Sequence, residues 1–544
     1  MEDIRNMPIG IQSFEAVRTG SYVYVDKTHF IPKLELVGRA YFLIRPRRFG
    51  KSLFISTLQA YFEGRTELFK GLAIEKYKAE TGGEWESYPT LKLDLSAQKY
   101  TQEEHLDAIL NDHINDWCKK YDIRFDIREP SIAFATIIKE LYKKFNKKVV
   151  ILIDEYDKPL IATLENEALH EHYRATLKAF YSVIKNSNDY IHMSFLTGIT
   201  KFGKVSIFSD LNNLYDISFN SEYSSICGIT EEELKSFFSS EVEGIACEYN
   251  ISYEEMLDML RAKYDGYRFS EKDERLYNPF SLCIAFQDRK LGDYWFATGT
   301  PTFLVRFLER RTFDIPDLEG NIKLTFDNLD IYRATKDNLI PFLFQAGYIT
   351  IKDYDRELNR YLLGFPNNEV RYAFLKDLLK VYTTAHTAND GTFIIDEFLE
   401  AIRGGDIERV LSLATSLIAS IPYDSFKDDA SDISKKAREK TSELREHNYQ
   451  TAIYLIFRLL GQYVRCEVHS SKGRSDVEVE TADAIYIFEF KMKGKPIDAI
   501  NQIKDSGYLD KYCASKKNLF LIGVAINQNK RTLGKWEVEK IKTE

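Results

Sequence analysis

Short apolar runs alternate with longer amphipathic stretches over residues 40–215. The apolar runs read AYFLI, TLKLDLS, VVILIDE and IHMSFLTG, and between them lie helical patterns such as SLFISTLQAYFEG and IAFATIIKELYKKF. Continuous apolar strands joined by helical crossovers are typical of a parallel sheet that helices cover on both faces. The pattern therefore predicts an α/β domain over residues 1–215, which opens with a turn at Gly20, an alternating strand in SYVYVDK and a helix.

The pattern becomes mostly helical over residues 216–370, where Thr230 is an N-cap candidate in front of three glutamates. The stretches AGYITIKDYD and RYLLGFP predict a small strand pair at the end of this region. Helices followed by a hairpin favour a helical, winged-helix-like extension. Residues 371–440 predict a helical connector that ends in a charged segment.

A second compact α/β pattern occupies residues 441–544. Its expected elements are a helix at 446–460, strands at 463–469, 475–481 and 484–490, a helix at 497–511 and a strand at 518–525. The whole chain is therefore expected to hold four segments: 1–215, 216–370, 371–440 and 441–544.

Composition limits the classes of protein that fit. A chain of 544 residues is long enough for two or three domains. The formal charge of −9 means that any contact with nucleic acid would need a local basic face. No signal-peptide pattern or bilayer-spanning apolar run is found, so we expect a cytoplasmic protein without membrane contact. Six scattered cysteines without a C-x-x-C pair argue against a structural zinc site.

The stretch RPRRFGKSL, residues 45–53, ends like a Walker A loop but begins with Arg45 where the motif has glycine. A strand precedes it and a helix follows it, which is the arrangement that surrounds phosphates with backbone N–H groups. The alternative is a helix start with a basic cap. The nucleotide-binding residues predicted here are Arg48, Phe49, Gly50, Lys51, Ser52 and Leu53.

A second part of this site is predicted at the end of VVILIDE, where Asp154 would hold magnesium together with Ser52, and Glu155 would polarise the attacking water. Thr200, beyond the next strand, would sense the γ-phosphate, although a solvated strand end fits it equally well. Arg268, in YDGYRFS, is a candidate for neutralising transition-state charge, but most exposed arginines are simply solvated.

Several longer stretches resemble the AAA-ATPase-like proteins of bacteria that carry a C-terminal PD-(D/E)XK nuclease domain. They are MPIGIQSFEAVRTGSYVYVDKT, FLIRPRRFGKSL, ILIDEYDKP, TGITKFGKVSIFSDLNNL, ICGITEEEL, YDGYRFS, YNPFSL and WFATGTPTFL. In that family R-P-R-R-F-G-K-S is itself the loop sequence. The resemblance implies a P-loop NTPase fold and ATP as the nucleotide.

The C-terminal pattern GRSDVEVETADAIYIFEFKMK carries a second set of candidate catalytic residues. Carboxylates that hold Mg²⁺, or Mn²⁺, and a lysine that positions water are the groups that phosphodiester cleavage needs. Strand periodicity puts Glu489 and Lys491 on one face, and the preceding strand brings Asp476 beside them. Asp476 and Glu489 are the predicted metal ligands. A solvated edge with an ion pair is the alternative.

Three further residues are accessory candidates for this second site. Gln502 and Tyr508 resemble the Q-x-x-x-Y element of RecB-type nucleases, although their spacing is longer. Glu446 lies where the first helix of that family carries an acid, and Glu443 competes for the place.

Together these features predict a protein that binds and hydrolyses ATP and contains a Mg²⁺-dependent nuclease acting on DNA. Nucleic acid, with DNA favoured, is the expected partner, and a homo-oligomer is compatible with the pattern. One alternative is a regulatory ATP switch whose C-terminal domain binds nucleic acid without cleaving it. Another is an ATPase with an inactive nuclease relic.

Overall fold

The computed structural model divides into two compact units. The first lies within Met1–Gly299 and Leu318–Val370, and the second within Arg371–Glu544. The structure describes residues 5–37, 40–96, 99–201, 214–295, 318–330, 339–382, 388–419, 453–461, 465–471, 474–491, 494–505, 512, 515, 517–527 and 532–541.

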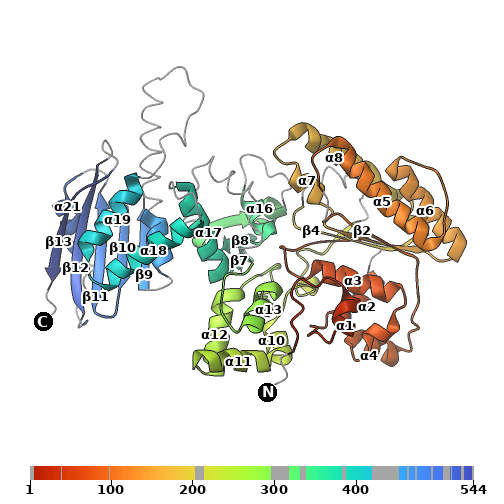
Figure 1. The fold of residues 1–544 in the computed structure, drawn as a ribbon, viewed down its shortest axis with the longest axis horizontal. Coiled ribbons are helices and arrows are strands. Elements are labelled where there is room, and N and C mark those ends of the chain that lie inside the picture. The colour runs from red at the N-terminus through yellow and green to blue at the C-terminus, as the bar shows by residue number, and fades with distance from the viewer. Residues whose placement is uncertain are drawn as a thin grey trace. The chain divides into compact units, whose positions relative to one another are not determined.

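A five-stranded parallel sheet forms the centre of the first unit, with the strand order β2-β3-β4-β1-β5 (Figure 1). Its inner strands are buried almost throughout, which explains why they are continuous apolar runs in the sequence. The strands are β1 (Ala40–Ile44), β2 (Thr90–Asp94), β3 (Val149–Asp154), β4 (Ile191–Gly198) and β5 (Tyr215–Asp216).

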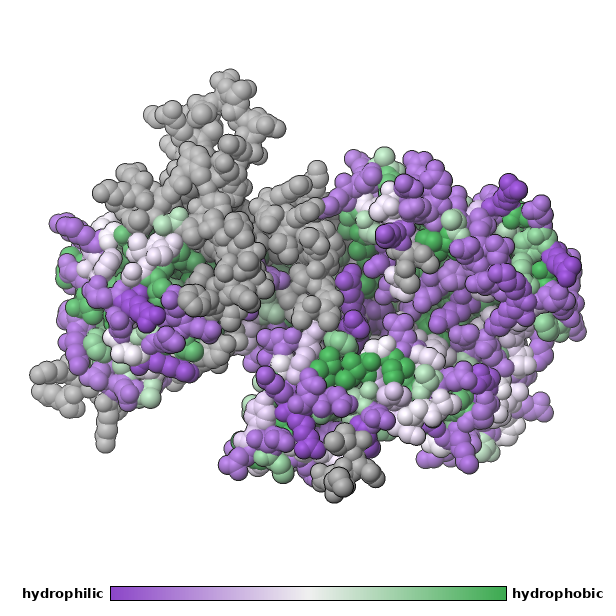
Figure 2. Space-filling view, viewed as in Figure 1, coloured by the Kyte–Doolittle hydropathy of each residue, from purple (hydrophilic) through white to green (hydrophobic). Residues whose placement is uncertain are grey.

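Helices cover both faces of this sheet, as predicted. Helices α5, α6 and α8 share a core with the strands on one face, and α1 to α4 lie on the other (Figure 1). Hydrophilic residues dominate the visible surface of the first group (Figure 2). The helices are α1 (Phe14–Thr19), α2 (Ile31–Val37), α3 (Lys51–Phe62), α4 (Ala73–Thr81), α5 (Glu103–Tyr121), α6 (Pro130–Phe145), α7 (Lys158–Ala162) and α8 (Glu167–Asn186).

A helical extension with its own apolar core completes the first unit. Thr230 caps its first helix through a capping box with Glu233, which confirms the predicted N-cap. A three-stranded antiparallel sheet follows, in the order β6-β8-β7. The elements are α10 (Glu231–Phe237), α11 (Ser239–Tyr249), α12 (Tyr253–Tyr264), α13 (Pro279–Asp288), β6 (Ile322–Thr325), α15 (Phe326–Asp330), α16 (Ile340–Ala346), β7 (Thr350–Asp355) and β8 (Arg360–Gly364).

The second unit contains a five-stranded mixed sheet with the order β13-β12-β11-β10-β9. β11 and β12 are parallel and are connected through α21, and the other pairs are antiparallel. A helical segment at 453–460 packs through Phe457 against Phe488. The elements are α17 (Asn368–Tyr382), which begins in the first unit, α18 (Ala388–Arg403), α19 (Ile407–Ala419), β9 (Arg465–Ser471), β10 (Arg474–Glu480), β11 (Ala484–Lys491), α21 (Pro496–Asp505), β12 (Asn518–Asn527) and β13 (Thr532–Ile541).

One local prediction is wrong, and two strands of the structure were not predicted. The alternating segment SYVYVDK is not a strand, because it pairs only through the isolated bridge between Asn6 and Tyr22. β6 and β13 were not predicted, because β6 is only four residues long and Gly534 and Lys535 interrupt the alternation in β13. The pairing of β13 with β12 is itself irregular between Val524 and Ile526. No helix in the described part of the chain is both long and apolar enough to cross a membrane.

Candidate functional site

The stretch RPRRFGKS forms the turn between β1 and α3. The backbone is left-handed at Arg48, with φ 66°, and at Gly50, with φ 95°, immediately before the helix begins at Lys51. Glycine adopts this conformation without steric strain, so the second glycine of the motif has a clear role here. The turn leads into the N-terminus of a 12-residue helix, which offers unpaired N–H groups and a favourable dipole to an anion.

The side chain of Lys51 is folded back onto this loop. It is 5% exposed, and its Nζ donates to the carbonyl oxygens of Arg45 and Pro46, both at 2.9 Å. Burial lowers the pKa of Lys51, and the nearby carboxylates of Glu155 and Asp154 oppose that shift. The lysine therefore lies between the loop and the carboxylates at the end of β3.

Arg45 has a different environment from the other basic residues of the loop. It is 1% exposed, and its guanidinium lies 4.2 Å from the centre of the Phe269 ring. Its guanidinium donates to four backbone carbonyl oxygens, those of Ile44, Ser218, Tyr223 and Ser224. Burial lowers the pKa of Arg45 to about 10. The residue that replaces the first Walker A glycine thus joins the end of β1 to the segment after β5.

The carboxylates predicted at the end of β3 lie at the carboxyl edge of the sheet. Asp154 is buried, and among the described residues both hydrogen bonds to its carboxylate fall on Oδ1: from the Thr197 hydroxyl at 2.6 Å and from the Glu155 N–H at 3.1 Å. Glu155 has the left-handed φ of 52°, which is strained for a residue with a side chain. Burial raises the pKa of Glu155, while Lys51 opposes that shift.

A carboxylate that the motif analysis missed organises the neighbouring strand end. Asp157 is fully buried and accepts hydrogen bonds from the N–H groups of Ile199 and Thr200 and from the Thr200 hydroxyl, at 3.1, 2.7 and 2.7 Å. Thr200, the predicted γ-phosphate sensor, is therefore bound to Asp157 in this structure. The signal in the sequence is the second aspartate in DEYDKP, three residues after Asp154.

An apolar pocket opens beside the turn between β1 and α3. Its empty volume is about 580 Å³, including solvent at its mouth. The segment 23–25, expected as a strand, forms one wall, the turn and α3 form a second, and α13 contributes to a third. Lys27 is the charged residue in its lining, and its Nζ is paired with Glu233 at 2.6 Å. Residues that line it include Val23, Tyr24, Val25, Phe49, Gly50, Leu53, Ile226, Gly228, Pro279 and Cys283.

The remaining predicted residues of the first unit lie as follows. Arg48 is exposed and stacks over Phe280 at 4.4 Å. Arg268 is buried, and its guanidinium donates to the backbone carbonyls of Ser270 and Glu271. In this conformation Arg268 is therefore held by its own loop.

The second candidate site lies on β10, β11 and α21. Asp476 is the cross-strand partner of Glu489 in the antiparallel β10–β11 pair. The Lys491 Nζ lies 3.2 Å from Glu489 Oε1 and donates to the side-chain oxygen of Gln502. Phe490, between the two charged residues, points to the opposite face and is buried. The structure thus brings together four predicted residues that are up to 26 positions apart in the sequence.

The chemistry of this second site suits a divalent cation. Glu489 is 1% exposed, and its Oε1 receives no hydrogen bond of proper geometry from the described residues, although Lys491 is close enough for an ion pair. A buried carboxylate oxygen in this state is a favourable ligand for Mg²⁺ or Mn²⁺. The described residues contain no group of three or more His, Cys, Asp or Glu that could hold a metal on its own.

Two accessory predictions, Glu446 and Tyr508, and the competing Glu443 lie outside the described residues. The structure shows a tyrosine that the motif analysis missed. Tyr512, ten positions after Gln502, donates from its hydroxyl to Glu478 at 2.6 Å. Glu478 is buried on β10, two residues beyond Asp476.

Comparisons with known proteins match two separate parts of the chain. Residues 8–208 match the family described as Predicted AAA-ATPase, and residues 444–536 match the PD-(D/E)XK nuclease superfamily. A protein of Azotobacter chroococcum mcd 1, described as "Uncharacterized protein in vnfD 5'region", is 35% identical over 543 residues and is aligned over 99% of both chains.

Among solved structures, the Aeropyrum pernix ORC2 protein in its ADPNP–ADP complexes is 11% identical, with 70% of this chain and 95% of that one covered and a TM-score of 0.24. The full-length relative and the two matched domains together show that this chain belongs to the family of AAA-ATPase-like proteins with a C-terminal PD-(D/E)XK nuclease-superfamily domain.

Proposed function

We propose that the protein binds and hydrolyses ATP in its first unit and that its C-terminal domain is a divalent-metal-dependent DNA nuclease. The observation that carries the nuclease assignment is the cross-strand pairing of Asp476 with Glu489, with Lys491 at ion-pair distance from Glu489. The observation that supports ATP binding is the position of Lys51 between a left-handed loop and the two acids at the end of β3.

The first unit provides groups for each part of ATP. The N–H groups of the turn and of the start of α3 would bind the phosphates, and Lys51 would exchange its two carbonyl acceptors for phosphate oxygens. The apolar pocket next to Gly50 has the chemistry that a purine base requires. Ser52 and the Oδ2 of Asp154 would hold Mg²⁺, which neutralises phosphate charge when it is bound.

Hydrolysis additionally needs a group that orients water. Glu155 is half-buried at the strand end, and its raised pKa makes it a stronger base than an exposed glutamate. Its left-handed backbone holds the carboxylate near Lys51, where their electrostatic interaction is felt by both groups. We therefore assign Glu155 to water activation and Asp154 to the metal.

In the C-terminal domain Asp476 and Glu489 would hold the metal ion, which supplies Lewis-acid stabilisation of the phosphodiester when bound. Lys491 would position the attacking water, and Gln502 would orient Lys491 through their hydrogen bond. A local basic face near this site would bind the DNA backbone in spite of the formal charge of −9.

The purified full-length protein tests both halves in one series of reactions. Plasmid, linear and single-stranded DNA are incubated with Mg²⁺ or Mn²⁺, with and without ATP, and phosphate release is followed in parallel. We expect Lys51→Met to abolish phosphate release, and Glu489→Gln and Lys491→Ala each to abolish cleavage. Lys504→Ala is the matched control, because Lys504 lies on α21 but pairs with Glu539 at 2.7 Å.

The outcomes separate the alternatives. DNA binding without cleavage under every metal condition would reject the nuclease and support a regulatory switch. Cleavage that survives both Glu489→Gln and Lys491→Ala would reject the assigned site. Absence of ATP binding by the unaltered protein would reject the assignment of the first unit.

A further inference from the structure

Trp295 connects the phosphate-binding turn to a distant part of the chain. Its indole Nε1 donates to the backbone carbonyl of Arg47, inside the turn, at 2.9 Å, although 248 positions separate the two residues. The side chain is 5% exposed, and its ring packs against that of Tyr348 with centroids 5.4 Å apart. The orientation of the Arg47 peptide is therefore linked to the position of Trp295.

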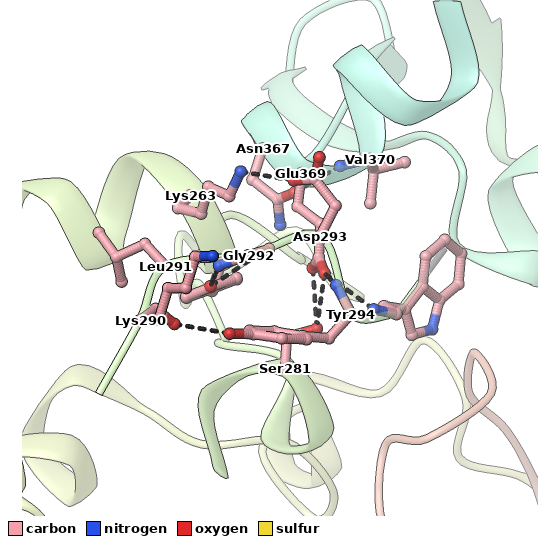
Figure 3. A network of polar contacts seen from close by, with 12 residues as sticks. Lys263, Ser281, Lys290, Leu291, Gly292, Asp293, Tyr294, Asn367, Glu369 and Val370 are labelled. Atoms are coloured by element: carbon pink, nitrogen blue, oxygen red, sulfur yellow. Dashed lines mark hydrogen bonds and ion pairs between the residues drawn. The ribbon is translucent and has the colours of Figure 1, made fainter. Parts of the chain in front are cut away.

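The backbone of Trp295 is in turn fixed by Glu369. The Glu369 carboxylate is fully buried in the first turn of α17 and accepts the N–H groups of Trp295 and Tyr294 at 2.8 and 2.6 Å (Figure 3). It also accepts the Ser281 hydroxyl, from α13, at 2.8 Å. Asn367 caps the same helix by accepting the Val370 N–H at 3.1 Å. The start of α17 and the loop before residue 296 are thus joined through the buried Glu369 side chain.

The turn must change its contacts when a phosphate binds. In this structure Lys51 donates hydrogen bonds to the carbonyl oxygens of Arg45 and Pro46. These residues directly precede Arg47, whose carbonyl accepts the hydrogen bond from Trp295. When Lys51 turns to a phosphate oxygen, those two carbonyls lose their cation. The Arg47 peptide lies between the two carbonyl groups that Lys51 releases and the left-handed Arg48. A reorientation of the loop therefore changes the hydrogen bond that the Trp295 indole makes to this peptide.

We propose that Trp295 and Glu369 transmit the nucleotide state of the turn to α17, with Trp295 as the positioning residue for the Arg47 peptide. Helix α17 begins at Asn368, within the first unit, and continues to Tyr382 in the segment assigned to the second unit. A change at its first turn can therefore be carried along one continuous helix into the segment assigned to the second unit. The proposal rests on the proposed binding of ATP by the turn.

The test uses amide hydrogen exchange in the full-length protein, with and without Mg²⁺ and a non-hydrolysable ATP analogue. Peptides from the turn report binding, and peptides from residues 372–382 report α17. Trp295→Phe keeps an aromatic ring beside Tyr348 but removes the indole donor. Trp117→Phe is the matched control, because Trp117 is 6% exposed and its indole donates to the Lys92 carbonyl at 3.2 Å, away from the turn.

In the unaltered protein and in Trp117→Phe we expect the analogue to change exchange in both sets of peptides. In Trp295→Phe the turn should still respond, with affinity reduced less than about tenfold, while the α17 response is lost. Glu369→Gln should weaken the α17 response in the same way. An α17 response that persists in Trp295→Phe overturns the proposal.

The proposal can fail separately from ATP binding. Protection of the turn with no change in α17 of the unaltered protein rejects the connection and leaves the nucleotide site intact. Absence of any nucleotide effect on the turn rejects both.

Discussion

Replacing Arg45 by methionine tests whether the arginine at the start of the turn is a structural cation or a phosphate ligand. Methionine preserves much of the length and the apolar contact with Phe269, but it removes every hydrogen-bond donor. The backbone carbonyls of Ile44 and Ser218 lose donors at 2.9 and 2.8 Å, and those of Tyr223 and Ser224 lose donors at 3.1 and 3.2 Å.

Two opposing effects set the magnitude. Each buried carbonyl that loses its donor costs about 1–3 kcal/mol, and there are four of them. Methionine, however, does not carry the desolvation penalty that lowers the pKa of Arg45 to about 10. Allowing for this gain, we expect a net loss of about 3 kcal/mol, comparable to breaking a buried ionic contact. That loss corresponds to a decrease in Tm of about 4 °C for a unit of about 350 residues.

The assay compares three variants in two measurements. Scanning calorimetry gives Tm, and titration with ATP at low temperature, where every variant is folded, gives Kd. Arg45→Met should lower Tm by about 4 °C and change Kd less than about threefold. Lys51→Met should weaken ATP binding by about tenfold or more, because it removes a charged phosphate ligand. Arg48→Met controls for loss of a basic residue that is exposed in the same turn, and we expect it to leave Tm almost unchanged.

The opposite pattern of changes in Tm and Kd would contradict the structural role of Arg45. If Arg45→Met leaves Tm unchanged and weakens ATP binding as much as Lys51→Met does, then Arg45 leaves its carbonyl partners to bind phosphate. A large fall in Tm for Arg48→Met would show that the turn is sensitive to any loss of charge, and the role assigned to Arg45 would lose its support.

Two further predictions concern contacts around the turn. Burial raises the pKa of Glu369 from 4.5 to about 7. The stabilising contribution of this carboxyl group is therefore complete below about pH 4.5 and is lost as the pH rises through 7. In urea unfolding, the free energy of unfolding of the unaltered protein relative to that of Glu369→Gln should fall by about 2–3 kcal/mol between pH 5 and 8, and a constant difference would contradict this. The titratable or charged groups around that carboxylate are Asp293, paired with Lys263, and Tyr264, Tyr267 and Tyr294. Gly347→Ala should lower Tm more than Gly320→Ala, because both have positive φ but only at Gly347 would the new Cβ meet Pro46, at 2.6 Å; equal calorimetric effects would mean that Pro46 gives way freely.

The parts of the fold that could be predicted from sequence are those set by local pattern. β1, β3 and β4 are buried on both faces, so their apolar runs identify them without knowledge of their neighbours. The N-cap at Thr230 depends on residues within one turn of helix, so it could also be predicted from the sequence. The strand positions of Glu489 and Lys491 followed from period two, and the register of β10 with β11 placed Asp476 opposite Glu489.

The parts that escaped prediction depend on long-range partners. Arg45 donates hydrogen bonds to carbonyl oxygens that lie more than 170 positions away in the sequence. No local sequence pattern indicates that a basic residue is buried there. Asp157 was visible as an acid, but its function depends on the parallel packing that brings the end of β4 beside it. SYVYVDK alternates like a strand, yet it contributes Val23 to Val25 to a pocket wall.

Arginine in place of the first Walker A glycine changes how the turn is held. A glycine would give the backbone freedom, whereas Arg45 fixes the entry to the turn by a buried network with the segment 218–224 and with Phe269. Trp295 and Gly347 contact the next two residues of the same turn. These partners belong to the segments that follow the parallel sheet, so the helical extension helps to support the turn between β1 and α3. Because coupling between two binding sites is reciprocal, a ligand of the extension that changed the affinity of the proposed ATP site would have its own affinity changed by ATP by the same factor.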